Sequence, residues 1–141
     1  MMEYISTSEK QTQEIAGKIA KQLNVGDVVL LQGDLGAGKT AFVKGIVKSF
    51  GGKAQEVTSP TFTIVNTYAL SKVKIYHFDL YRIENPEELF NIGIEEYLYG
   101  DGICFVEWPE RAMSLLPEYS KQITIEKLDQ NKRKIIFGEN K

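Results

Sequence analysis

Residues 33–40 read Gly-Asp-Leu-Gly-Ala-Gly-Lys-Thr, an uninterrupted match to the phosphate-binding loop pattern GxxxxGK(S/T). This motif constrains the fold more than any other feature of the chain. The apolar run at 28–31 before it predicts a buried strand, and apolar residues at helical spacing from Phe42 to Phe50 predict a helix after it. The order of strand, loop and helix is the context in which such a loop binds phosphate, so we predict a nucleotide-binding α/β unit here.

The composition of this loop suits an anion. Its three glycines lack the Cβ atoms that would keep backbone N–H groups from closing around phosphate oxygens. The following helix points its positive N-terminal end at the same place. Lys39 would neutralise the β- and γ-phosphates of a nucleotide, and Thr40 would offer a hydroxyl to Mg²⁺.

The chain has 141 residues, of which 43% are hydrophobic and 26% charged. This length and composition predict a single domain over residues 1–141. The formal net charge of -2 gives no basic field that would hold nucleic acid unaided, so DNA is not expected as a partner, and another component would have to hold any RNA.

A single cysteine, Cys104, lies within an apolar run and has no partner for a disulfide. We expect a buried and inert thiol in a reducing compartment. No apolar stretch approaches the roughly 20 residues that a membrane span needs. These features predict a cytoplasmic protein that does not enter a membrane.

The segment 74–82 reads as a strand with Tyr76 and Phe78 on one face and His77 and Asp79 on the other. A buried carboxylate needs a partner, so Asp79 is expected to meet a metal-bound water, a hydroxyl or a cation. A structural ion pair with Arg82 or a lysine is the alternative. His77, the only histidine, is expected to be a core or rim residue rather than a catalyst.

A second acid ends the apolar strand predicted at 102–107. This layout is that of a Walker B element, in which the acid at the carboxyl end of a parallel strand reaches Mg²⁺ through water. The usual acid is Asp, whereas this chain has Glu107. Trp108 follows and is either a gate, a partner contact or simple rim packing. Pro109 is predicted to start a helix that continues through Leu116.

The Thr-rich segment at 57–63 has two interpretations. Pro60 can fix a simple turn. Alternatively, a segment at this place in a P-loop protein can be a mobile switch that brings a hydroxyl or carbonyl to the metal and γ-phosphate, in which case Thr61 is the candidate.

The remaining segments are predicted to be mainly scaffold. A short strand at 3–5 precedes a helix that Thr7 or Ser8 can cap, and the Ser8-x-x-Gln11 spacing resembles a capping box. Asn85 and Pro86 mark another helix start, and Gly93 is expected to divide that stretch into two short helices that cover the core or bind a partner.

The tail predicts two strands, 122–128 and 133–137, joined by a polar turn as a hairpin at a sheet edge. The basic run at 132–134 is too short to predict RNA binding by itself. The adenine contacts of a nucleotide are not assigned by the sequence. The first helix and the turn at 131–133 are the candidates.

The class of activity follows from what the motifs lack. The chain has only three arginines, so it has no Arg-rich lid of the kind that small-molecule kinases close over two substrates, and it has no NKxD sequence of a GTPase. An ATPase that switches a partner is favoured, with water attacking the γ-phosphate in line and Asp79 or Glu107 ordering that water. Turnover alone should be slow, because no arginine is clearly placed as a finger. The alternatives are a small-molecule kinase and a nucleotide sensor without catalysis.

Four segments together resemble the TsaE family, and they occur in the family's order: Gly-Asp-Leu-Gly-Ala-Gly-Lys-Thr at 33–40, Ser-Pro-Thr-Phe-Thr at 59–63, His-Phe-Asp-Leu-Tyr-Arg at 77–82 and Val-Glu-Trp-Pro-Glu-Arg at 106–111. The resemblance implies an ATPase of the bacterial tRNA threonylcarbamoyladenosine machinery that acts with the proteins TsaB and TsaD and meets tRNA indirectly, through that complex. It also implies a P-loop NTPase-like three-layer α/β fold with a mainly parallel central sheet and antiparallel flanking strands.

The same resemblance carries roles onto matching residues. Thr40 and Glu107 become Mg²⁺ ligands, Thr61 the switch residue, and Asp79 with Glu107 the residues needed for hydrolysis. Trp108 is implied to be an aromatic beside the site, and ATP and Mg²⁺ are the implied cofactors. The expected nucleotide contacts are Gly33, Asp34, Leu35, Gly36, Ala37, Gly38, Lys39 and Thr40. Because both acids are expected to be unpaired without metal, removing one should raise the stability of the metal-free protein.

Overall fold

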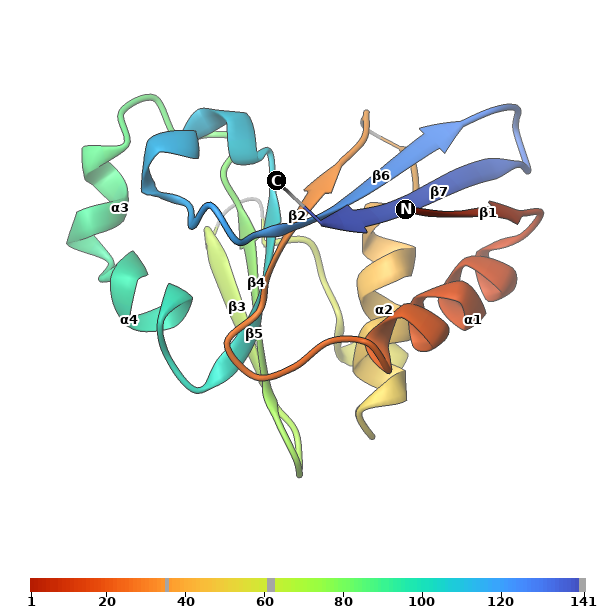
Figure 1. The fold of residues 1–141 in the computed structure, drawn as a ribbon, viewed down its shortest axis with the longest axis horizontal. Helices are drawn as coiled ribbons and strands as arrows, with labels where there is room; N and C mark the ends of the chain where they lie inside the picture. Colours follow the sequence, from red (N-terminus) through yellow and green to blue (C-terminus); the bar gives the residue numbers. More distant parts are fainter. Residues whose placement is uncertain (35, 61–62, 140–141) are drawn as a thin grey trace.

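The computed structural model describes residues 1–34, 36–60 and 63–139. Within these ranges a single sheet of seven strands runs through the molecule in the order β1-β7-β6-β2-β5-β4-β3 (Figure 1). The strands are β1 (Met2–Ser6), β2 (Val28–Gln32), β3 (Val65–Ala69), β4 (Lys74–Asp79), β5 (Gly102–Glu107), β6 (Lys121–Lys127) and β7 (Arg133–Glu139).

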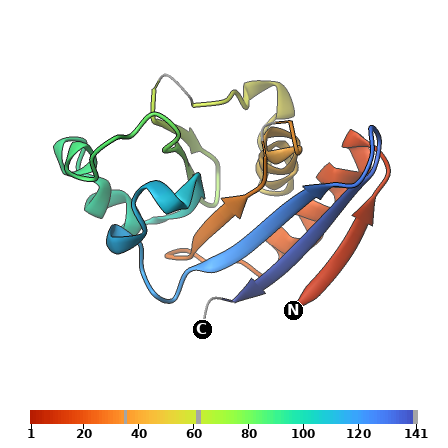
Figure 2. The same ribbon diagram turned by 90° about the horizontal axis from the view of Figure 1, so that it is seen from above.

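The helices lie on both sides of this sheet (Figure 2). They are α1 (Glu9–Ala20), α2 (Lys39–Ser49), α3 (Glu87–Asn91) and α4 (Ile94–Leu98), with short 3-10 helices η1 (Ala54–Glu56), η2 (Pro109–Arg111) and η3 (Met113–Leu115). None of the helices in the described ranges is long and apolar enough to span a membrane.

Alternating side chains of the central strands supply two hydrophobic cores. Val29 and Leu31 of β2 pack in the core beneath α1 and α2, whereas Val28 and Leu30 pack in the core beneath α3 and α4. All four are completely buried, which is expected for a strand covered on both faces. The three-layer α/β fold predicted from the resemblance is therefore confirmed.

The predicted strand directions are confirmed as well. In the centre of the sheet β6, β2, β5 and β4 are parallel neighbours. On the flanks β3 pairs antiparallel with β4, β7 pairs antiparallel with β6, and β1 pairs antiparallel with β7. Because parallel strands end at the same edge, the loops that follow β2, β4 and β5 meet there, which is where open α/β sheets place their ligands.

Local capping signals match the structure closely. The hydroxyl of Ser8 accepts a hydrogen bond from the Gln11 amide at 3.0 Å, as the capping-box spacing predicts. The return bond is displaced by one residue, since the Gln11 side chain accepts from the amide of Thr7 and not from that of Ser8. The predicted start of α3 is shifted by one residue, because Pro86 is its capping residue, although the side-chain oxygen of Asn85 accepts from the Glu87 amide at 3.0 Å. Gly93 separates α3 from α4 as predicted.

Two predictions about the second half of the chain were wrong. The β6–β7 hairpin does not form a sheet edge: β6 pairs with β2, and β1 returns to cover β7. Alternation gave the strands correctly but could not give their order, because β1 is distant in sequence. The helix predicted from Pro109 to Leu116 is two 3-10 turns, since Ala112 is buried between them with a non-helical backbone (φ -151°).

Cys104 lies in the middle of β5 and is buried, as predicted. Its thiol donates to the carbonyl oxygen of Tyr97 at 3.2 Å. Burial raises the pKa of the Cys104 thiol to about 12, so it stays protonated near neutral pH and is a poor nucleophile.

Candidate active site

The loop between β2 and α2 has the backbone geometry that its glycines predict. Gly36 and Gly38 adopt φ values of +79° and +108°, which are unfavourable for other residues. A Cβ atom on Gly33 would lie 2.7 Å from the Ile125 carbonyl oxygen, so the loop can pass this close to β6 only with glycine. Leu35 lies outside the described residues.

The N-terminus of α2 opens toward this loop. Gly38 is its capping residue and supplies no side-chain hydrogen bond to the first turn. The first-turn amides and the helix dipole therefore face the loop without a capping side chain, an arrangement that favours an anion. Ala37 is almost fully buried beneath the loop, and its amide donates to the Asp34 carbonyl oxygen at 3.0 Å.

The predicted site residues converge on one cavity of about 250 Å³. Its walls come from the glycine loop, the start of α2, the ends of β4 and β5, and the segment before β3. The lining residues are Gly36, Gly38, Lys39, Thr40, Ser59, Asp79, Glu107 and Trp108. Gly33 and Asp34 line an adjoining cavity of about 130 Å³ that shares Lys39 and Trp108. Thr61 lies outside the described residues, although Ser59 of the same segment reaches the larger cavity.

Lys39 is the centre of this arrangement. Its ammonium group donates to the Gly33 carbonyl oxygen at 2.8 Å and lies 3.7 Å from Oε1 of Glu107. It also lies 4.5 Å from the centroid of the Trp108 ring, within the range of a cation–π contact. Only 7% of Lys39 is exposed, so these three groups replace the water that its charge would otherwise hold.

Asp79 and Glu107 end neighbouring parallel strands and occupy paired positions in the sheet. Both are buried, with exposures of 5% and 4%. Oδ1 of Asp79 accepts a hydrogen bond from the amide of Tyr81 at 2.9 Å, which fixes the carboxylate at the start of the following turn. Two carboxylates held at the same edge beside a lysine form a site that can accept a cation or orient a polar ligand.

The expectation that both acids are unpaired without metal was wrong, since Asp79 accepts a hydrogen bond from the Tyr81 amide and Glu107 has two side-chain partners. Oε2 of Glu107 lies 2.5 Å from Nε2 of His77, and Oε1 faces Lys39. His77 is fully buried, which confirms its prediction as a core residue, but it also contacts the candidate catalytic acid. The sequence pattern already placed His77 on the face of Asp79, but the contact with Glu107 depends on the pairing of β4 with β5, which period-2 alternation within one strand does not report.

Trp108 forms one wall of the cavity. Its backbone is left-handed (φ 56°), and its ring lies 4.9 Å from that of Tyr81. The guanidinium of Arg111 lies 5.7 Å from the Tyr81 ring on the outer side. The indole thus contacts both Lys39 and Tyr81, so it takes part in the packing of the site as well as in its rim.

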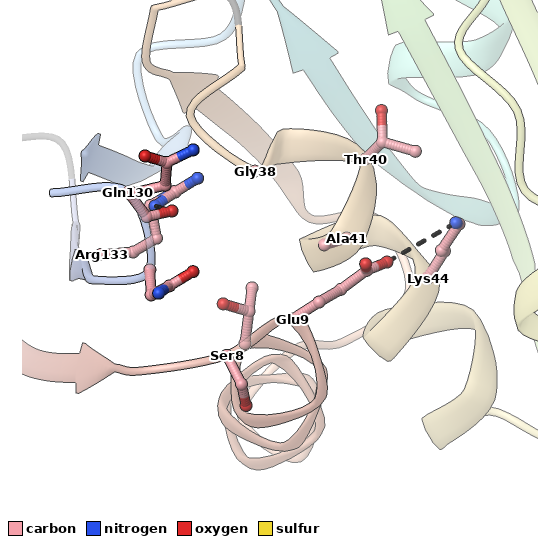
Figure 3. Close-up of a pocket in the computed structure, with 10 residues that line it drawn as sticks. Ser8, Glu9, Gly38, Thr40, Ala41, Lys44, Gln130 and Arg133 are labelled. Carbon is pink, nitrogen blue, oxygen red and sulfur yellow. Dashed lines mark hydrogen bonds and ion pairs between the residues drawn. The ribbon is translucent and has the colours of Figure 1, made fainter.

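A second cavity, of about 350 Å³, opens on the other side of the loop (Figure 3). Three segments that are distant in sequence form it: the start of α1, the start of α2 and the turn between β6 and β7. The lining residues are Ser8, Glu9, Thr12, Gly38, Thr40, Ala41, Lys44, Gln130, Asn131 and Arg133. Gly38 and Thr40 line both this cavity and the one that holds the two acids.

Arg133 ties the β6–β7 turn to the loop. Its Nε donates to the Ala37 carbonyl oxygen at 2.8 Å, and an Nη donates to that of Gly36 at 3.3 Å. The basic run at 132–134 was too short to predict a binding role, and these bonds give Arg133 a structural role that no local pattern signals. They also occupy the guanidinium on one side of the loop.

The donor set suits a hard cation that keeps other ligands. Thr40, Asp79 and Glu107 offer oxygen atoms around the 250 Å³ cavity. Over the part of the chain that the structure describes, no group of three or more His, Cys, Asp or Glu side chains is arranged to hold a metal by itself. Mg²⁺ in phosphate sites is typically held by one or two carboxylates together with phosphate oxygens and water, so the residues fit this ion with a nucleotide present.

The parallel sheet, the glycine loop at the end of β2 and the acids ending neighbouring strands define a P-loop NTPase-like α/β fold. Comparison with known proteins gives the family. Residues 6–135 match the family model described as "Threonylcarbamoyl adenosine biosynthesis protein TsaE". The chain belongs to the TsaE family, and this family takes part in the biosynthesis of threonylcarbamoyladenosine in tRNA.

Individual relatives agree with this assignment. The chain is similar to the "tRNA threonylcarbamoyladenosine biosynthesis protein TsaE" of Treponema pallidum, with 42% identity over 95% of this chain and 98% of the relative. The protein of the same name from Bacillus subtilis is 38% identical over 96% of this chain and 84% of its own length. The crystal structure of Bacillus subtilis YdiB superimposes with a TM-score of 0.81 at 34% identity, covering 99% of this chain and 86% of that one.

Proposed function

We propose that this chain is a Mg²⁺-dependent ATPase that serves the tRNA threonylcarbamoyladenosine machinery. The observation that carries the proposal is the convergence of Lys39, Thr40, Asp79 and Glu107 on one cavity at the mouth of the glycine loop. This is the combination that phosphoryl transfer requires: a cation for the transferred phosphate, a hydroxyl and an acid for the metal, and an acid for water.

The loop would hold the phosphates of ATP. Backbone amides around Gly36 and Gly38 and the N-terminus of α2 offer fixed donors to phosphate oxygens. Lys39 would exchange its present partners, the Gly33 carbonyl and Glu107, for the β- and γ-phosphates. The ammonium already lies in the site, so this exchange needs movement of the side chain only.

Thr40 and Glu107 would hold Mg²⁺ through a hydroxyl and a carboxylate. An ion held by these two residues would supply positive charge that neutralises the charge developing on the transferred phosphate. Asp79, one strand away from Glu107, would orient the attacking water, and the reverse assignment of the two roles is equally compatible with the paired positions of the two acids.

The hydrolysis expected from this site is slow. Arg133 donates to the carbonyls of the loop, and Arg111 stacks on Tyr81, so these two guanidinium groups have structural partners in the free chain. A group that stabilises the charge of the transition state is then a natural contribution from a partner protein.

The 350 Å³ cavity is the place for the nucleoside. It adjoins the loop at Gly38 and Thr40. Its walls include the start of α1 and residues of the turn at 131–133, the two segments that the sequence offers for adenine contacts. Polar side chains such as Ser8 and Gln130 would hydrogen-bond a base or ribose there (Figure 3). Asn131 also lines this cavity.

TsaB and TsaD are the proposed partners, with tRNA met through their complex. The family assignment supports this, since the relatives are named for tRNA threonylcarbamoyladenosine biosynthesis. The net charge of -2 is consistent with an indirect contact to tRNA. The cytoplasmic location and the absence of DNA as a partner remain predictions from the sequence.

The test is Mg²⁺-dependent phosphate release from ATP by the purified chain, alone and with TsaB and TsaD. Release should rise with the partners and disappear in Glu107→Ala, while ATP binding by that variant is largely kept. ATP binding without release under either condition would support a nucleotide sensor instead. Transfer of phosphate to a metabolite instead of water would support a kinase.

A further inference from the structure

The imidazole of His77 is completely buried, and it meets the carboxylate of the proposed catalytic acid. We infer that His77 is a positioning residue, which holds Oε2 of Glu107 so that Oε1 stays directed at the phosphate loop and its metal. This inference rests on the proposed function of Glu107. It assigns a role to a residue that need not touch nucleotide, metal or water itself.

The two oxygens of Glu107 have different neighbours. Oε2 meets Nε2 of His77, and Oε1 lies 3.7 Å from the ammonium of Lys39. An ionised carboxylate only accepts hydrogen bonds, so Nε2 carries the proton and donates. The strand-held histidine thus occupies one oxygen and leaves the other for the cavity, where Lys39 now lies.

The second ring nitrogen supports this tautomer. Nδ1 of His77 is buried and has no hydrogen-bond partner within the described ranges. With the proton on Nε2, the unpartnered atom is a lone pair and not an N–H group, and unpaired acceptors are better tolerated in protein interiors than unpaired donors. The contact with Glu107 is therefore the polar contact by which the interior retains this imidazole.

The backbone makes the contact rigid. His77 belongs to β4, which has a hydrogen-bonded neighbour on each side. Its paired residue on β5 is Phe105, and Glu107 lies two residues further along the same face. A diagonal pair on one face of a sheet is within reach of long side chains. Without the imidazole, Oε2 of Glu107 would lose this hydrogen-bond donor while remaining buried. The carboxylate would then have to rotate so that Oε2 meets Lys39 instead.

Three variants test the inference. His77→Leu removes the donor, and His77→Gln returns an N–H group at the reach of Nε2. The control, Tyr76→Phe, removes a hydrogen bond of 2.7 Å to Asp101 from the adjacent residue, whose side chain lies in the other core. Thermal unfolding shows which variants fold. If His77→Leu does not, His77→Asn replaces it, because its shorter amide does not reach Glu107.

The readout is the affinity for ADP, by titration calorimetry, with and without Mg²⁺. The gain in affinity on adding Mg²⁺ should fall about 10- to 100-fold in His77→Leu, as is typical when the residue behind a metal ligand is lost. It should return in His77→Gln and be unchanged in Tyr76→Phe. In a Glu107→Ala background, His77→Leu should cause no further loss, since its effect acts through Glu107.

A folded His77→Leu variant with the Mg²⁺ dependence of the wild type would overturn the inference and leave the proposed function intact. So would an equal further loss in the Glu107→Ala background, because His77 would then act elsewhere. A wild-type chain whose ADP affinity does not respond to Mg²⁺ would overturn the proposed metal role of Glu107 and, with it, the inference.

Discussion

The two edges of the parallel sheet differ in how deeply their charged side chains are buried. At the edge where the strands begin, Lys121 meets Asp27 at 2.7 Å and Lys74 meets Asp101 at 3.2 Å. The second pair is open to solvent, with 49% and 67% of its side chains exposed. At the edge where the strands end, Lys39 and Glu107 lie 3.7 Å apart and are 7% and 6% exposed.

This difference in burial distinguishes charged residues that only pair with one another from those that form the candidate site. Charges at the first edge are paired at short range. Water screens the exposed pair of Lys74 and Asp101, which contributes little to stability, whereas Lys121 and Asp27 are partly buried. At the second edge Lys39 and Glu107 are buried, and burying charged groups is costly for the fold even where partners such as the Gly33 carbonyl and His77 lie close. A buried lysine beside two acids in a cavity fits our proposal that this edge binds an anion and a cation. Variants of the charged residues at the opposite edge serve as controls for this proposal.

The largest expected effect is on turnover. Lys39→Ala should reduce kcat/KM for ATP by about 100- to 1,000-fold, because it removes a cation aimed at the transferred phosphate. Lys74→Ala removes a lysine of the opposite edge and should stay within about two-fold of the wild type, as surface pairs contribute little. Phosphate release measured for both variants gives the comparison. Similar losses in the two would contradict the separation of roles.

Stability should respond at the same edge. Glu107→Ala leaves His77 and Lys39 buried without their common partner, so the free energy of unfolding of the metal-free chain should fall by about 1–3 kcal/mol. Urea unfolding checks this value, and Asp101→Ala at the exposed edge should cost less. A rise in stability on removing Glu107 would restore the view that this acid is unpaired.

Arg133 tests the link between the phosphate loop and the nucleoside cavity. Arg133→Met keeps much of the side-chain volume and loses the bonds to the carbonyls of Ala37 and Gly36. Nucleotide affinity should fall about ten-fold, because the loop loses the guanidinium that fixes its carbonyls, and roughly 1.4 kcal/mol, the size of one such charged hydrogen bond, corresponds to a factor of ten. Calorimetric titration with ADP measures it. Lys134→Met, on the neighbouring residue, is the matched control and should bind as the wild type does.

The smallest expected effect is on stability at alkaline pH, and it concerns Cys104, which lies in the middle of β5 between the two edges of the sheet. Burial raises the pKa of Cys104 from about 9 to about 12. Below pH 9 the thiol is protonated in the folded and unfolded chain alike, so this contribution is complete there. Between pH 9 and 12 the unfolded chain loses the proton first, and stability falls as pH rises. In urea unfolding at pH 8 to 11, the free energy of unfolding should fall less steeply with pH for Cys104→Ala than for the wild type. Equal slopes would contradict the burial of this thiol.

Much of this molecule follows from local sequence patterns. The glycine loop, its strand and its helix are contiguous, and the acids at 79 and 107 stand out because each ends an apolar strand. Those features depend on neighbours within a few residues, which sequence patterns report well. The capping of α1 by Ser8 and the break at Gly93 were predictable for the same reason.

The features that sequence patterns did not predict depend on residues that are far apart in the chain. The position of the β6–β7 hairpin depends on β1, more than a hundred residues earlier along the chain. The contact between His77 and Glu107 joins two neighbouring strands, β4 and β5. The hydrogen bonds from Arg133 to the loop connect residues that are 96 and 97 positions apart in the sequence. Such pairings are set by the order of strands in the sheet, and no periodicity within a segment encodes that order.

The most direct test of the central claim compares the two edges in one experiment. Amide hydrogen exchange is measured for the free chain and for the chain with Mg²⁺ and a non-hydrolysable ATP analogue. Protection should increase at 36–41, at the strand ends near 79 and 107, and at the turn 129–133, with little change at 24–27 and 72–74. Protection concentrated at the strand beginnings, or none at saturating nucleotide, would contradict the assignment of the buried, charge-rich edge as the nucleotide site.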